Sequence, residues 1–181
     1  MTALSLLAMV LCLRIVISDL YARRVPNLWL LVAAGTGVVI ITTSALTSSD
    51  SDPMRHVLGL LIGFAALIPF YAIRWMGAGD VKFFAVVGLL LGWQALLPVW
   101  IVASLLAGVH AVAVSAWRAL QGLLPVRMVL ARQQWESQLH ERPAIQRMHS
   151  ARQGRAGIPY AAYLGAAAMA WVLWTVAGGV R

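Results

Sequence analysis

The chain has 181 residues, of which 61% are hydrophobic and only 11% charged, and it carries a formal net charge of +8. This composition excludes an ordinary soluble domain, in which about a quarter of the residues are charged. Open sheets leave backbone groups unpaired in lipid, so apolar runs of this length favour helices. We therefore expect an all-α membrane protein in which residues 1–181 form one polytopic domain.

Six apolar runs follow one another along the chain, and most approach the roughly 20 residues that a helix needs to cross a bilayer core. We expect transmembrane helices at residues 2–18, 28–46, 57–73, 81–91, 99–117 and 158–176. The fourth run is short by this measure, and an extension to Leu97 would lengthen it. Gly92, Trp93 and Pro98 mark the turn at its outer end.

The basic residues lie almost wholly between these runs, where they predict orientation, because cytoplasmic loops of membrane proteins are enriched in Lys and Arg. Arg23 and Arg24 follow the first run, and Arg74 follows the third. The connection at residues 47–56 contains two aspartates against one arginine. We therefore expect the basic loops in the cytoplasm, and both the N-terminus and the C-terminus outside.

The longest connection, residues 118–157, is a third basic loop with seven arginines and two glutamates. We expect it to be the one sizeable cytoplasmic segment, with membrane lipids as partners, since anionic headgroups attract such loops. Residues 126–140 have a pattern that fits an amphipathic helix on the membrane surface. No nucleic-acid partner is expected, because the net positive charge is accounted for by orientation in the membrane.

Two acidic residues stand apart from the four that lie in polar loops. Asp19 follows the first run, and Asp80 follows a Gly-x-Gly turn at the start of the fourth, so the orientation places both at the cytoplasmic face. A carboxylate deep in a membrane helix costs about 2.5 to 3.5 kcal/mol and is a functional candidate by default. Two carboxyls a few ångströms apart tend to share one proton, which suits one as base and the other as acid. That is the chemistry of an aspartyl protease, in which a water molecule attacks the peptide carbonyl.

Two other readings of these acids stay open on the residues alone. In the first they are structural: Asp19 pairs with Arg14 or Arg23, and Asp80 caps its helix and pairs with Lys82, since carboxylates are favoured at helix N-termini. In the second the chain is a small transporter or a pilus-assembly protein that uses the acids for proton transfer or helix pairing. A proton carrier more often holds its acids near the middle of the membrane than at one face.

The sequence around the two acids resembles a known family. Asp19 is followed by Arg24-Val25-Pro26-Asn27, the fourth run is preceded by Gly77-Ala78-Gly79-Asp80-Val81-Lys82, and the last run begins with Ile158-Pro159-Tyr160. With the six-span pattern, these motifs resemble the type IV prepilin peptidases, the Gly-x-Gly-Asp aspartyl proteases of the bacterial inner membrane.

The resemblance implies roles for particular residues. The two catalytic aspartates fall on Asp19 and Asp80, and the flexible active-site glycines fall on Gly77 and Gly79. Two further positions inside the motifs are candidates for supporting roles, Asn27 and Lys82. The implied substrates are prepilin or pseudopilin precursors, with a short basic leader, a Gly at the cleavage point and a hydrophobic helix in the same bilayer.

The chain lacks the cytoplasmic insert with paired cysteines that the longer, bifunctional members carry, since Cys12 is its one cysteine. It therefore resembles the short peptidases of tight-adherence (Flp) pilus systems, and we expect no N-methyltransferase activity. No metal and no organic cofactor are expected, because the four histidines are scattered without ligand spacing and two carboxyls with a water suffice for hydrolysis. The oligomeric state and the identity of the pilin do not follow from the sequence.

Overall fold

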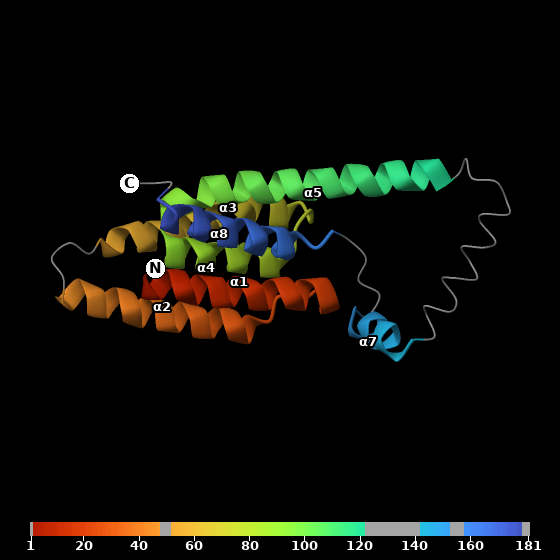
Figure 1. Cartoon of the computed structure of the whole chain (residues 1–181). Coiled ribbons are helices and arrows are strands. Elements are labelled where there is room, and N and C mark those ends of the chain that lie inside the picture. Colours follow the sequence, from red (N-terminus) through yellow and green to blue (C-terminus); the bar gives the residue numbers. More distant parts are fainter. Residues whose placement is uncertain (1, 48–51, 122–141, 153–157, 179–181) are drawn as a thin grey trace.

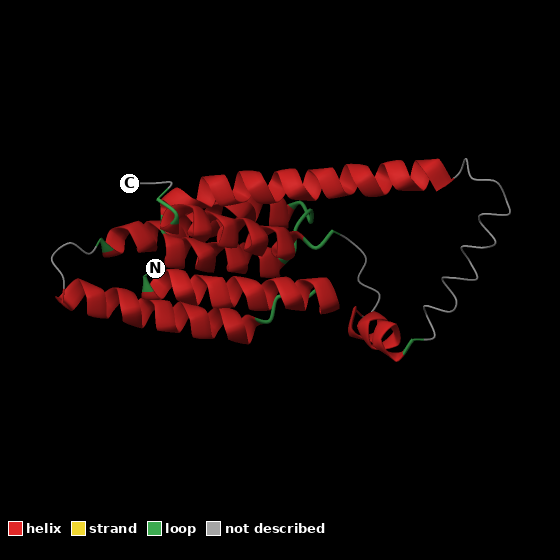
Figure 2. Ribbon diagram, in the orientation of Figure 1, coloured by secondary structure: helices red, strands yellow, loops and turns green. Residues whose placement is uncertain are grey.

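The computed structural model describes residues 2–47, 52–121, 142–152 and 158–178, and within these ranges the chain forms helices and no strands. The elements are α1 (Ala3–Ala22), α2 (Asn27–Thr47), α3 (Pro53–Ala72), α4 (Ala78–Leu91), α5 (Trp93–Gln121), α7 (Pro143–Arg152) and α8 (Tyr160–Val176). All except α7 lie roughly side by side in one bundle (Figures 1 and 2). The predicted all-α class is confirmed.

Four helices, α1, α2, α3 and α5, are long and apolar enough to cross a membrane by length and composition, and α8 is a shorter apolar helix. These helices fit a multi-pass membrane protein. The first turn of α1 and the last turn of α8 lie at the same end of the bundle (Figure 1). The expected count of six spans and the orientation of the termini stay predictions.

The first helix is longer than expected. We placed its end at residue 18, but α1 continues to Ala22 and stops at Arg23, which adopts a left-handed conformation with φ of 53°. No glycine or proline interrupts the chain before that point, so the helix persists. As a result, Asp19 lies inside the last turn of α1 and not in the loop after it.

The expected extension of the fourth span to Leu97 is wrong. Helix α4 ends at Leu91, because Gly92 takes a φ of 84° that side chains disfavour, and α5 begins immediately at Trp93. The turn is therefore at Gly92, while Pro98, which we took as part of it, lies inside α5. A proline removes one helical hydrogen bond and kinks a helix without necessarily ending it.

The segment expected to be a basic loop is partly helical. Helix α5 continues to Gln121 and so includes Arg118, and the separate helix α7 occupies residues 143–152. The amphipathic helix expected at residues 126–140 lies outside the described residues.

Helix α4 is the centre of the bundle and packs against α1, α2, α3, α5 and α8. Every residue from Phe83 to Leu91 is buried. At 14 residues α4 is about 21 Å long, shorter than a hydrocarbon core of about 30 Å. Surrounding helices cover it, so its length need not match the bilayer.

The C-terminal end of α4 is held by side chains from α3. Nη2 of Arg55 donates a hydrogen bond to the carbonyl oxygen of Leu91 (3.4 Å), and Nδ1 of His56 donates one to the carbonyl oxygen of Leu89 (2.8 Å). The last carbonyls of a helix have no partner within the helix, so these bonds satisfy groups that lipid cannot. They also fix the position of α4 along its axis, and with it the position of Asp80 at the opposite end.

Glycines set the spacing between α3 and α4. A Cβ atom on Gly88 would overlap the backbone carbonyl of Gly59, and a Cβ on Gly59 would overlap that of Gly88. Small residues allow helix backbones to approach closely in membranes.

We expect Gly88→Ala to destabilise the protein by roughly 1–3 kcal/mol, because the added methyl group must push α3 away from α4. The thermal unfolding midpoint in detergent should fall. Gly108→Ala is the matched control, since a Cβ there meets nothing within 4 Å. Equal midpoints for Gly88→Ala and the wild type would contradict this packing.

Candidate active site

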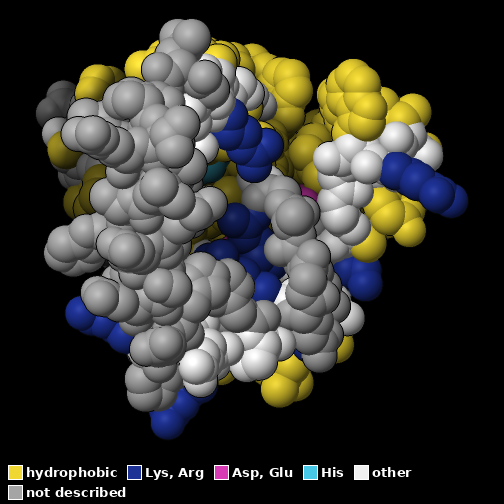
Figure 3. Space-filling model, turned by 90° about the vertical axis from the view of Figure 1, so that its right-hand side faces the viewer, with side chains coloured by type: hydrophobic (Ala, Val, Ile, Leu, Met, Phe, Trp, Pro, Cys, Tyr) yellow, Lys and Arg dark blue, Asp and Glu magenta, His cyan; other side chains and the backbone are white. Residues whose placement is uncertain are grey.

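Both candidate aspartates lie at one end of the bundle, where α1 and α3 end and α4 and α8 begin (Figure 1). Seen onto this end, Lys and Arg side chains are visible at several places, and a small patch of acidic surface shows among the described side chains (Figure 3). Basic and acidic side chains are therefore both present at this end of the bundle.

Asp19 is the more enclosed of the two, with 6% of its surface exposed. Its Oδ2 accepts a hydrogen bond of 2.9 Å from the backbone N–H of Ala162, in the first turn of α8. The first N–H groups of a helix have no partner within the helix, and the helix dipole favours a negative charge there. The start of α8 therefore holds the Asp19 carboxylate in place.

Asp80 is half-buried and lies in the first turn of α4. The backbone N–H of Gly77, at the N-cap, donates a hydrogen bond of 3.2 Å to its Oδ2. The capping that a purely structural reading expected is therefore present. Each carboxylate is thus positioned by a backbone amide, Asp19 by one from α8 and Asp80 by one from its own turn.

Gly79 explains how the motifs around Asp19 and Asp80 come together in space. A Cβ atom at this position would lie 2.9 Å from Cβ of Val25, which belongs to the connection between α1 and α2. A side chain here would push the two segments apart, so glycine is needed for the close approach. The connection after Asp19 and the turn before Asp80 are therefore in contact.

The two carboxylates are close enough for the charge of Asp19 to act on Asp80. The charge of Arg23 acts in turn on Asp19, and Nε and Nη1 of Arg23 are buried without a hydrogen-bond partner among the described residues. Two neighbouring carboxyls beside a cation can share one proton, so that one carboxyl is neutral while the other is charged.

A tyrosine stands beside the pair. The charge of Asp80 acts on the half-buried phenol of Tyr160, whose hydroxyl is 3.1 Å from Oγ of Ser104 in α5. The sequence identified Tyr160 only as part of the motif at the start of the last run and gave no indication of Ser104. The motif at the start of the last span pointed to the tyrosine, but a lone serine within an apolar run carries no signal of its partner.

The two supporting candidates lie together. Nζ of Lys82 donates a hydrogen bond of 3.5 Å to Oδ1 of Asn27, which joins α4 to α2. Lys82 therefore bonds to Asn27, not to Asp80 as the structural reading proposed. At about 100° per residue, Lys82 lies about 200° around α4 from Asp80, so this pair faces away from the carboxylates.

Arg14 does not pair with Asp19. Its guanidinium lies over the ring of Trp29, 4.7 Å from the ring centroid, and so links α1 to α2. A cation over an aromatic face is stabilised by the ring quadrupole. This contact explains how a charge is accommodated inside the first span.

Helix α7 contacts the end of α1 that carries Asp19. The guanidinium of Arg152 donates hydrogen bonds to the carbonyl oxygens of Leu20 (2.8 Å) and Tyr21 (3.3 Å), in the last turn of α1. Basic side chains near a helix C-terminus stabilise it in this way. Sequence reasoning assigned no such role to the basic segment, because the bond joins residues that are distant in the chain.

Metal ligation finds no support in the described part of the chain. Within residues 2–47, 52–121, 142–152 and 158–178, no three His, Cys, Asp or Glu side chains lie close enough to hold a metal ion. The groups that do gather here, two carboxyls and a phenol, are suited to moving protons.

The sequence matches a known protein family. The model of the type IV leader peptidase family matches residues 6–112, which include both aspartates and the Gly-x-Gly turn. Neither the curated proteins nor the solved structures contain a match to this chain.

Proposed function

This chain belongs to the type IV leader peptidase family and is a prepilin peptidase-like hydrolase, and we propose that it is an intramembrane aspartyl endopeptidase. It removes the basic leader of prepilin or pseudopilin precursors at the cytoplasmic face of the bacterial inner membrane. Asp19 and Asp80 are its catalytic residues, and Gly77 and Gly79 form the active-site loop.

The observation that carries this proposal is the meeting of two carboxylates from different helices. Asp19 comes from the last turn of α1 and Asp80 from the first turn of α4, and their charges interact. Each also accepts a backbone hydrogen bond that fixes its orientation. Fixed, interacting acids suit general acid–base catalysis, which contributes about 10²–10⁴-fold to a rate.

In the proposed reaction, one carboxylate takes a proton from water as the water oxygen attacks the peptide carbonyl. The protonated carboxyl gives its proton to the carbonyl oxygen, which becomes a hydroxyl of the tetrahedral intermediate. When the C–N bond breaks, the nitrogen takes a proton from the carboxyl that received one from water and leaves as an amine. A hydroxyl of the intermediate returns its proton to the other carboxylate, and the leader leaves as a carboxylic acid. Water is consumed, and the two carboxyls end with the one proton they began with.

The position of the acids argues against the transporter alternative. Asp19 is in the last turn of α1 and Asp80 in the first turn of α4, so both lie near one end of the helices. A proton pathway across the bilayer places ionisable groups near the midplane. In the proposed orientation, this end is where a leader in the cytoplasm meets a helix in the membrane.

We further propose that the enzyme is a short peptidase of the kind found in Flp pilus systems, without N-methyltransferase activity. Its single cysteine supports this assignment, because the bifunctional relatives use paired cysteines in an insert that this chain lacks.

The function is tested by co-expressing the chain with a precursor from the same genome that has a basic leader, a Gly and a hydrophobic helix. Leader removal is followed on a gel, with the precursor alone as control. We expect the shorter product only when the chain is present. An uncut precursor, with both proteins inserted in the membrane, would refute the function.

Tyr160→Phe should slow leader removal severalfold, because it removes a hydroxyl that bonds to Ser104 within reach of the Asp80 charge, and such a hydrogen bond contributes about 0.5–1.5 kcal/mol. Tyr163→Phe is the matched control, since Tyr163 lies on the same helix with its ring against His110. The measurement is the initial rate of cleavage. Equal rates for the two variants would show that the Tyr160 hydroxyl takes no part.

A further inference from the structure

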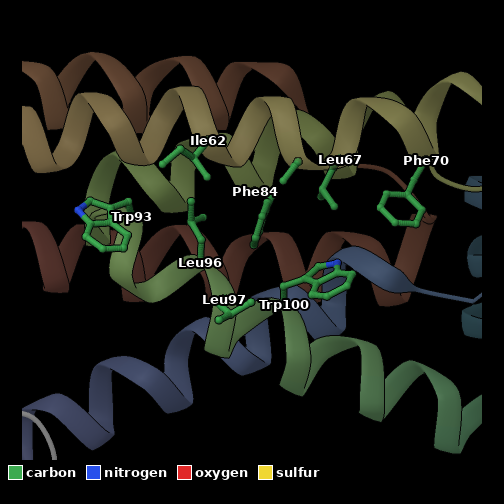
Figure 4. Close-up of a pocket in the computed structure, with 9 residues that line it drawn as sticks. Ile62, Leu67, Phe70, Phe84, Trp93, Leu96, Leu97 and Trp100 are labelled. Carbon is green, nitrogen blue, oxygen red and sulfur yellow. The ribbon is translucent and has the colours of Figure 1, made fainter.

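An apolar groove runs along the bundle between α3, α4 and α5, and its volume is about 330 Å³. Trp93 lies at one end, and Phe70 and Trp100 lie at the other (Figure 4). Its floor is buried, with Phe84 2% exposed, whereas Leu97 on its wall is 65% exposed. The groove is therefore open to the surface of the bundle at Leu97.

The groove leads toward Asp80. Its floor residue Phe84 follows Asp80 by four positions, which places it about one turn further along α4 and about 40° around it. Phe84 and Asp80 therefore share a face of α4. The floor continues by one turn into the candidate active site.

The wall of the groove that α5 forms also continues toward the candidate active site. Its residues recur at helical spacing as Trp93, Leu96, Leu97 and Trp100. One further turn along this face is Ser104, whose hydroxyl is bonded to that of Tyr160. From Trp93 to Ser104 the stripe is about 16 Å long, or about three helical turns.

A second cavity of about 370 Å³, between α2, α3 and α4, lacks this connection. It is lined on α4 by Lys82, Ala85 and Val86, on the side of the helix that faces away from Asp80. The ammonium of Lys82 at its polar end would also repel a basic leader. Of these two cavities, only the first lies on the face of α4 that carries Asp80.

We propose that this groove, lined by α3, α4 and α5, binds the hydrophobic helix of the precursor over the first two or three turns after the cleavage point. This inference rests on the proposed function. A peptide bond held between Asp19 and Asp80 leaves its following residues within about one turn of Phe84, and an apolar segment there has to return to the bilayer. The groove offers it an apolar path in the right direction and of the right length.

The test places a photo-reactive amino acid at Leu97 or at Leu31 of the full chain, in membranes that also contain the precursor described above. Both leucines are exposed, 65% and 70%, and each lines a cavity, but Leu31 belongs to the one beside Lys82. We expect at least about tenfold more cross-linking to the precursor from position 97. Cross-linking from position 31 only, from both equally, or from position 97 to lipid only would overturn the proposal.

A second pair of variants gives a kinetic readout. Leu97→Trp fills the groove with a side chain that lipid tolerates, and we expect it to slow leader removal severalfold, while Leu31→Trp leaves the rate unchanged. Normal cleavage by Leu97→Trp would count against the groove but not against the peptidase. If the unmodified chain does not cut the precursor, the function fails first and the groove assignment falls with it.

Discussion

Asp80→Asn is expected to slow leader removal by at least about 100-fold, because the amide can neither take up nor release the proton that the reaction requires. The fold should survive. Asn accepts a hydrogen bond as Asp does, so the bond from the N–H of Gly77 at the start of α4 can persist. The initial rate of cleavage in membranes of matched protein content measures the effect.

Asp52→Asn is the matched control for this variant. Asp52 caps the N-terminus of α3 and accepts a hydrogen bond of 3.3 Å from the N–H of Arg55, at the opposite end of the bundle. It repeats the chemical change at a capping carboxylate outside the candidate site. If Asp80→Asn cleaves at the wild-type rate, Asp80 is only a structural cap. The same conclusion follows if Asp80→Asn and Asp52→Asn slow cleavage equally.

Asp19→Asn is expected to reduce cleavage by a similar factor, for a different structural reason. Asp19 is held by the N–H of Ala162, and an Asn side-chain oxygen can accept the same bond, so α8 should stay in place. What is lost is the charge that acts on Asp80 and the second proton site. The measurement is again the initial rate, together with the thermal unfolding midpoint.

The two readouts separate catalysis from folding. A slow variant with an unchanged midpoint supports a chemical role for Asp19, whereas a slow variant with a lowered midpoint points to loss of the contact with α8. Cleavage at the wild-type rate would remove Asp19 from the mechanism.

Much of the fold could be predicted from the hydrophobic runs and from the residues that break helices. Apolar runs of membrane length gave the helices and most of their bounds to within a few residues, because lipid leaves few alternatives for the backbone. The errors arose where one residue decides the local conformation. The left-handed Arg23 ended α1 later than expected, and Gly92 ended α4 where we had allowed it to continue to Leu97.

The candidate site could be predicted only in part. The two aspartates stood out because acids are rare in this chain, and the alternation of basic loops placed them at one face. The backbone amide of Ala162 and the hydroxyl of Ser104 could not be foreseen, since an amide has no sequence signal and both partners are distant in the chain. The hydrogen bond from Arg152 to the last turn of α1 could not be foreseen for the same reason.

The most direct test of the central claim uses the purified chain in lipid vesicles with the precursor and no other protein, and identifies the products by mass spectrometry. The account predicts one cut, where the basic leader meets the hydrophobic helix, made by the wild type and lost in both Asp19→Asn and Asp80→Asn. Cleavage at that site by the variant that lacks both carboxylates, Asp19→Asn with Asp80→Asn, would contradict it.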